Sequence, residues 1–236
     1  MIKFFRNIRK SLVMENNTSK YIKYAIGEIF LVVVGILIAL WINNLNEENN
    51  KRIKEKAILE ELHKDFLYNL KDFKEVKRLH YYSLKNTILF KKYINHPNPI
   101  LVKDSIAKYY FSAFNSAAFN PSNGVVESLI SSGEYQLIRN DTLRKYIISW
   151  KDVVSNYSYN ESFTGNLWSQ KIEPFLINEG DLTTLNNPKN LELITSQKFK
   201  NLTERHLLYI NNLVNHIKTG VIEEYIEGIT RLSKTN

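Results

Sequence analysis

The sequence contains no cysteine, and this absence excludes several kinds of chemistry. A 236-residue chain without cysteine forms no disulfide, has no thiolate nucleophile and cannot build a cysteine-ligated metal site. It also lacks the HExxH, GxSxG, P-loop and GxGxxG motifs of common metalloproteases, hydrolases and nucleotide-binding proteins. The sequence therefore predicts no catalysis, no metal and no cofactor.

Glycine and proline are scarce as well. Only eight glycines and five prolines occur, and most stand between segments in which apolar residues recur at helical spacing. Because these two residue types are the poorest helix formers, their scarcity indicates long helices. Hydrophobic residues make up 44% of the chain and charged residues 24%, which is enough apolar surface for a packed core. The predicted fold class is all-α.

Basic residues exceed acidic ones, but their distribution does not indicate nucleic acid binding. The formal net charge is +8, while residues 43–236 hold 26 basic and 22 acidic residues. Residues 1–23 hold six Lys or Arg and a single glutamate. No RNA- or DNA-binding motif accompanies the charge. The excess precedes a long apolar run, where it would meet anionic lipid headgroups, so a lipid bilayer is the predicted partner.

The apolar run, residues 24–42, is typical of a membrane span. As a helix it would be about 28 Å long, close to the thickness of a bilayer's hydrocarbon core. Tyr21 and Tyr24 lie at one end and Trp41 at the other, where interfacial aromatic residues occur. A cleaved signal peptide is the alternative, but the run is too long and no small-x-small cleavage pattern follows it. The predicted organisation is a basic amphipathic segment at 1–18, a transmembrane anchor at 19–43 and an extramembrane α-helical domain at 44–236.

The residues before the span predict its orientation. Over the first fourteen residues, apolar and basic side chains fall on opposite helical faces, as in a helix that lies in the membrane interface. A basic tail that only sets orientation is the alternative. Since basic residues favour the cytoplasmic side, we expect a cytoplasmic N-terminus and a domain on the other side. The predicted membrane-interface anchors are Lys3, Arg6, Arg9, Lys10, Lys20, Lys23 and Trp41.

One carboxylate, Glu28, interrupts the apolar run. On a helix, Glu28, Val32, Gly35 and Ala39 share a narrow stripe, and Gly35 and Ala39 form a small-xxx-small pair of the kind that lets membrane helices approach closely. A carboxylate on such a stripe points toward protein rather than lipid, so we expect a helix–helix contact face. Two alternatives are a side chain that reaches to the headgroups and a proton-carrying carboxylate.

Beyond the span the chain continues to Asn95 without glycine or proline, and HPNP at 96–99 ends the predicted helix. A kink near Leu84, Ile88 and Tyr93 is the alternative to one unbroken helix. The predicted buried stripe of this helix consists of Ile53, Leu59, Leu62, Phe66, Leu70, Phe73, Val76 and His80.

Further helices are predicted from the same periodicity. They are expected at 103–113, at 124–131, from Asn140 or Asp141 to about Tyr157, around 166–176 with an end near Pro174, and at 199–232. EYQLI at 134–138 is expected to be extended, and NEGDLTTLNNPKN at 178–190 to be a surface loop. The last helix would pack antiparallel along the first, giving an antiparallel bundle.

Few residues outside the span form a candidate site. Arg139, Asn140 and Arg144 at a helix start could hold an anion or ligand, although helix capping with a salt bridge is the favoured explanation. Glu60-x-x-His63 is half of a di-iron motif whose second half is missing, and His206 and His216 are too far apart to share a metal. The aromatic residues of the domain indicate a bundle core more than a ligand cavity.

Two stretches resemble an uncharacterised family of single-span bacterial inner-membrane proteins. They are MIKFFRNIRK with KYIKYAIGEIFLVVVGILIALWINNLNE, and FNPSNGVVESLISSGEYQLIRNDTLRKYI. The resemblance implies a bacterial inner-membrane location with a periplasmic domain and brings no known activity. The predicted function is a periplasmic helical scaffold, adaptor or sensor that forms homo-oligomers or joins an envelope complex. The alternative is an envelope-acting enzyme or ligand-binding sensor with a site in residues 119–144.

Overall fold

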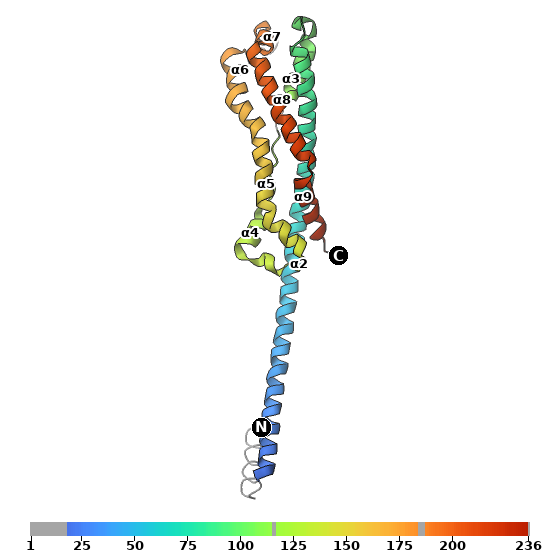
Figure 1. Ribbon diagram of the computed structural model, residues 1–236, viewed down its shortest axis with the longest axis vertical. Coiled ribbons are helices and arrows are strands. Elements are labelled where there is room, and N and C mark those ends of the chain that lie inside the picture. Colours follow the sequence, from blue (N-terminus) through green and yellow to red (C-terminus); the bar gives the residue numbers. More distant parts are fainter. Residues whose placement is uncertain (1–17, 115–116, 184–186, 236) are drawn as a thin grey trace. The chain divides into compact units, whose positions relative to one another are not determined.

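The computed structural model describes residues 18–114, 117–183 and 187–235, which form helices and no β-strand (Figure 1). The predicted all-α fold class is therefore confirmed for this part of the chain. The predicted interfacial helix at the N-terminus lies outside the described residues. The chain divides into two compact units, Met1–Glu55 and Lys56–Asn236, and helix α2 (Thr18–Ile94) contributes to both.

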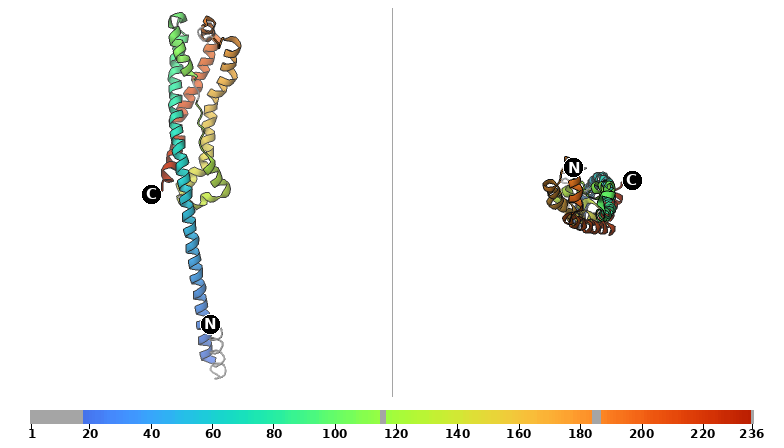
Figure 2. Two further views of the ribbon diagram at one scale, coloured as in Figure 1. Left: turned by 180° about the vertical axis from the view of Figure 1, so that it is seen from behind. Right: turned by 90° about the horizontal axis from the view of Figure 1, so that it is seen from above.

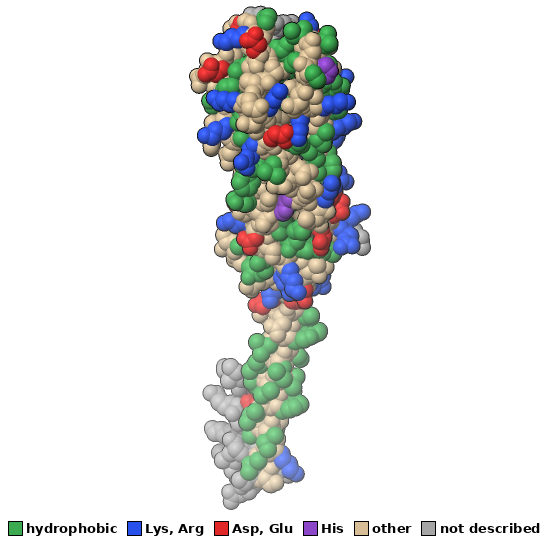
Figure 3. Space-filling model, turned by 45° about the horizontal axis from the view of Figure 1, so that its top comes forward, with side chains coloured by type: hydrophobic (Ala, Val, Ile, Leu, Met, Phe, Trp, Pro, Cys, Tyr) green, Lys and Arg blue, Asp and Glu red, His purple; other side chains and the backbone are tan. Residues whose placement is uncertain are grey.

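In the first unit, most apolar side chains of α2 are exposed. None of its most apolar window is buried, and Figure 3 shows hydrophobic side chains covering this segment. By length and composition, this helix could cross a membrane. The large exposed side chains are Ile22, Ile26, Ile29, Phe30, Leu31, Val32, Val33, Ile36, Leu37, Ile38, Leu40, Trp41, Ile42 and Leu45.

The second unit begins with the remainder of α2, which ends at Ile94, just before the predicted HPNP stop. The elements that follow are η1 (Pro99–Val102), α3 (Lys103–Ala113), α4 (Gly124–Ser132), η2 (Glu134–Leu137), α5 (Asp141–Leu167), the π-helical turn η3 (Trp168–Ile172), α6 (Glu173–Glu179), α7 (Pro188–Thr195), α8 (Gln197–Lys218) and α9 (Val221–Leu232).

These helices run in two opposite directions and form a bundle (Figures 1 and 2). Helix α5 runs parallel to α2, since Phe66 contacts Trp150 and, further along both helices, His80 contacts Glu161. Helices α8 and α9 run the opposite way. Lys91 near the end of α2 pairs with Glu204 of α8, and His63 Nδ1 donates a hydrogen bond to the Thr230 carbonyl of α9. The prediction that the C-terminal helices pack antiparallel along α2 agrees with these contacts.

The core of the bundle consists of two apolar clusters. The first contains Leu62, Phe66, Phe73, Val76, Phe119, Val126, Leu129, Ile138, Leu143, Ile147, Trp150, Tyr157, Ile210, Leu213, Ile217, Ile222, Ile226 and Ile229. The second contains Phe90, Ile94, Ile106, Ala113, Phe114, Leu167, Ile172, Leu176 and Phe199. The predicted stripe of α2 is buried or half-buried from Leu59 to His80, whereas Ile53 is exposed and was wrongly included.

The EYQLI stretch is not extended. Residues Glu134–Leu137 form the 3-10 turn η2, and only Ile138 has extended backbone angles. Gly133, with a φ of 76°, ends α4, and its carbonyl accepts a hydrogen bond from the Gln136 amide. This left-handed residue folds the chain into a turn before a strand can begin.

The prediction that a helix ends near Tyr157 is also wrong, because α5 continues to Leu167 and leads through η3 into α6. The polar residues of this stretch are tolerated since their side chains bond to their own helix. Asn160 donates to the Asn156 carbonyl and Ser162 to the Tyr159 carbonyl. Pro174 does not end a helix either; it lies in the first turn of α6, where its missing N–H is harmless.

The single helix expected at 199–232 is two helices. Gly220, with a φ of 77°, separates α8 from α9, and its amide donates to the Ile217 carbonyl. The apolar spacing of residues 199–232 did not reveal this break, because α9 continues the same spacing and buries Ile222, Ile226 and Ile229. Both ends of the loop predicted at 178–190 are helical instead, as α6 ends at Glu179 and α7 begins at Pro188.

We expect alanine to have opposite effects at two glycines. Gly220→Ala forces a Cβ into the left-handed region and should lower the free energy of unfolding by about 1 kcal/mol. Gly165, in continuous helix with open space around its Cβ position, should gain about 0.5–1 kcal/mol on substitution by alanine. Urea unfolding followed by circular dichroism measures both. Equal signs for the two variants would contradict the assigned backbone conformations.

Candidate functional site

The predicted contact face lies on the first-unit segment of α2. The helix is unbroken there, so Glu28, Val32, Gly35 and Ala39 do share one face. Glu28 is half-buried, the other three are exposed, and a Cβ added to Gly35 would meet no atom within 4 Å. Whether this face meets a partner stays a prediction.

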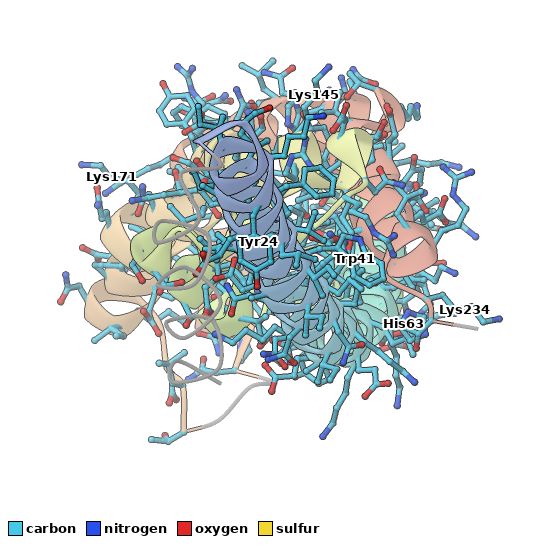
Figure 4. All side chains as sticks on the ribbon, turned by 90° about the horizontal axis from the view of Figure 1, so that it is seen from below. Tyr24, Trp41, His63, Lys145, Lys171 and Lys234 are labelled. Carbon is cyan, nitrogen blue, oxygen red and sulfur yellow. The ribbon has the colours of Figure 1, made fainter. Side chains whose placement is uncertain are left out.

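The predicted interface anchors are only partly described. Lys3, Arg6, Arg9 and Lys10 lie outside the described residues, and of Lys20 the structure describes the helical backbone alone. Lys23 and Trp41 are exposed on α2. Figure 4 shows Tyr24 and Trp41 projecting from this helix, at the two ends of the apolar run.

Arg139, Asn140 and Arg144 lie together at the start of α5. The Asn140 side chain caps the helix by accepting a hydrogen bond from the Leu143 amide at 2.9 Å. Arg144 donates to the Ile138 carbonyl and pairs with Asp141. The Asn140 and Arg144 side chains thus have local structural partners here, and the predicted anion site stays a prediction.

A buried polar centre that the sequence did not predict lies between α2 and α5. His80 Nε2 is 2.9 Å from Glu161 Oε1, and both side chains are almost fully buried. The same carboxylate accepts a hydrogen bond from the Phe119 amide, which is 3.2 Å from Oε1 and 3.1 Å from Oε2. Glu161 therefore joins two helices to the segment that connects α3 with α4.

Tyr157, one helical turn before Glu161, completes this polar centre. Burial raises the pKa of Tyr157, and the negative charge of Glu161 raises it further. Its hydroxyl is fully buried and has no hydrogen-bond partner of ordinary geometry among the described residues. A hydrogen bond to Glu161 of less ideal geometry is a third cause of the raised pKa, so the carboxylate is the polar group that this hydroxyl meets.

The connecting segment at 117–123 is held along its length by polar side chains. Asn69 and Ser122 form two hydrogen bonds, from the Asn69 amide to the Ser122 carbonyl at 3.0 Å and from the Ser122 amide to Asn69 Oδ1 at 2.7 Å. The Trp150 indole donates to Asn123 at 2.7 Å. Since its backbone groups are bonded to fixed helices, the segment forms a rigid wall beside α5.

A pocket of about 290 Å³ opens beside the polar centre. It is lined by residues 117–120 and by five residues of α5, namely Ser158, Glu161, Ser162, Thr164 and Gly165. A second hollow of about 370 Å³, between η3–α6 and α8, is lined mainly by exposed side chains such as Gln170, Lys171 and Lys198. The first is the one that reaches a buried ionisable group.

A second buried polar contact is centred on the Ala113 carbonyl at the end of α3. Ser83 and Thr87 of α2 both donate to it, at 2.6 and 3.1 Å, and His206 Nε2 of α8 lies 3.0 Å away. The His206 ring packs against Phe114 with centroids 4.8 Å apart. Burial lowers the pKa of His206 to about 4, only partly opposed by the Ala113 hydrogen bond.

His206 should make the helical unit sensitive to acid. The unfolded chain binds a proton at His206 near pH 6.5 and the folded chain only near pH 4, so stability falls as the pH falls through that window. The expected loss between pH 7 and pH 4 is about 3 kcal/mol more for the unmodified chain than for His206→Gln. Urea unfolding at several pH values measures it; parallel pH profiles for the two chains would contradict this assignment.

No group of three or more potential metal ligands was found among the described residues. His63, of the Glu60-x-x-His63 pattern, contacts the Thr230 carbonyl, whereas His206 and His216 lie beside Phe114 and Tyr157 respectively. These three histidines are thus engaged in packing and hydrogen bonding.

Comparison with known proteins identifies a family but no characterised relative. Residues 28–202 match a family of unknown function (DUF6090), a range that begins at Glu28 and includes the whole of the polar centre. Neither the curated proteins nor the solved structures gave a match. As the match covers well over half of the chain, the protein belongs to the DUF6090 family.

Proposed function

We propose that this protein is a membrane-anchored, non-catalytic scaffold or adaptor whose helical domain is held at the membrane surface by α2. The observation that carries this proposal is the exposed apolar segment of α2. A helix of this length with hydrophobic side chains on every face is stable in water only at high cost, and lipid provides the missing apolar contacts.

The orientation follows from the basic residues before the span. Six Lys or Arg precede residue 24, which favours a cytoplasmic N-terminus and a periplasmic position for Lys56–Asn236. The inner membrane of a bacterium is the location that the family resemblance implies. A scaffold role accords with a second unit that consists of packed helices.

Self-association through the Glu28, Val32, Gly35 and Ala39 face is the proposed mode of assembly. Small residues at 35 and 39 allow close backbone approach, and the open space around Gly35 leaves room for a second helix. The partner is either a second copy of this chain or another envelope protein.

Gly35→Leu should weaken this assembly. A leucine on the contact face separates the two helices, so we expect at least a tenfold loss of crosslinked dimer in native membranes. Leu37→Ala changes bulk at a different angle of the same helix and serves as the control. Unmodified chain that stays monomeric under crosslinking, or a Gly35→Leu variant that crosslinks equally well, would defeat the proposal.

A further inference from the structure

Glu161 is accessible from the pocket beside the polar centre. It lines the pocket, and about a tenth of its side-chain surface is exposed although the residue as a whole is buried. Its carboxylate accepts a hydrogen bond from the Phe119 amide, contacts His80 and lies close to the Tyr157 hydroxyl. The pocket therefore reaches a buried carboxylate whose position is fixed by its neighbours.

The rest of the pocket wall carries no opposing charge. None of the described residues that line it is Lys, Arg or His, and apart from Glu161 they are small, neutral or aromatic. Ser158, Ser162 and Thr164 supply hydroxyl groups, while alanines and Gly165 leave the space open. In a partly dehydrated site, such an arrangement favours a cation over an anion or a neutral molecule of equal size.

We propose that this pocket binds a small organic cation through a primary ammonium or guanidinium group that donates to Glu161. Charge-assisted hydrogen bonds of this kind are about twice as strong as neutral ones. The volume of about 290 Å³ corresponds to roughly ten water molecules, which limits the ligand to a few carbon atoms beyond its charged group. The site is separate from the α2 contact face and adds ligand binding to the scaffold.

Three probes of equal length test the charge preference. The full chain in an uncharged maltoside detergent is titrated with n-butylammonium, 1-butanol and butyrate, and binding is followed by saturation-transfer NMR. We expect n-butylammonium to bind at least ten times more tightly than the other two. Equal binding of all three, or no binding of n-butylammonium, would overturn the proposal.

Two variants locate the binding. Glu161→Gln should weaken n-butylammonium binding at least tenfold, whereas Glu173→Gln, at an exposed glutamate outside the pocket, should leave it unchanged. Gly165→Leu fills the pocket without touching the His80–Glu161 contact, and the open space at this position lets it fold. It should abolish binding even if Glu161→Gln fails to fold; binding retained in Gly165→Leu would place the cation elsewhere and refute the site.

Discussion

Replacing Glu161 with alanine should lower the free energy of unfolding of the helical unit by about 3–5 kcal/mol. The substitution leaves His80 buried without its partner and the Phe119 amide without an acceptor, and breaking a buried pair by removing one member costs this much. Natural domains are stable by only about 5–15 kcal/mol, so the loss is a large share of the total. Urea unfolding monitored by circular dichroism measures it.

The control for this prediction is Glu173→Ala. Glu173 is exposed in the first turn of α6, so its replacement should change stability by less than about 0.5 kcal/mol. A change below about 1 kcal/mol for Glu161→Ala would mean that the carboxylate is not buried as described.

A double substitution tests whether His80 and Glu161 stabilise the fold as a pair. His80→Leu leaves Glu161 without its histidine partner and Glu161→Leu leaves His80 without its carboxylate, whereas the combined variant removes both members of the pair. We therefore expect the double variant to lose at least 1 kcal/mol less than the sum of the single losses. Additive losses would show that the two side chains do not interact.

Helical periodicity predicted most of the fold. Leu62, Phe66 and Phe73 are buried as their spacing indicated, and the limits of α3 and α4 agree with the predicted ones to within a residue. The errors occur where the backbone angle of a single residue ends a helix. Gly133 and Gly220 adopt left-handed conformations that an apolar pattern does not reveal, since the pattern resumes beyond each of them.

The polar centre was missed for a different reason. Glu161 stands in a polar run, SNYSYNES, and lies beyond the helix end that was predicted near Tyr157. The spacing of the buried residues could have predicted its burial, because Tyr157, Glu161 and Thr164 extend the buried face of α5 at intervals of four and three residues. His80 was correctly placed on the buried stripe of α2, but its partner lies 81 residues away and leaves no local pattern.

The pocket depends wholly on tertiary structure. It forms where the segment at 117–120 passes α5, and that path is set by contacts such as Asn69 with Ser122, 53 residues apart. The sequence alternative of a ligand site in residues 119–144 included Phe119 and Asn120 of this wall. It did not include Glu161, the residue on which binding is now proposed to depend.

Placing two lysines in the apolar run should remove the protein from the membrane. Val33→Lys with Leu37→Lys puts charges near the middle of the span, where each costs about 2.5–3.5 kcal/mol, or about 5–7 kcal/mol together. We expect most of the chain to move from the membrane pellet to the soluble fraction. Leu67→Lys with Ile88→Lys changes two exposed apolar residues of the second unit and should leave the chain in the pellet.

Alkaline carbonate extraction of membranes from cells that make the unmodified chain tests the central claim most directly. Carbonate strips proteins that are held by surface charge and leaves those that cross the bilayer. If α2 anchors the protein through residues 24–42, the unmodified chain stays in the carbonate-washed pellet and the Val33→Lys, Leu37→Lys variant does not. Release of the unmodified chain into the supernatant would contradict membrane anchoring and, with it, the proposed function.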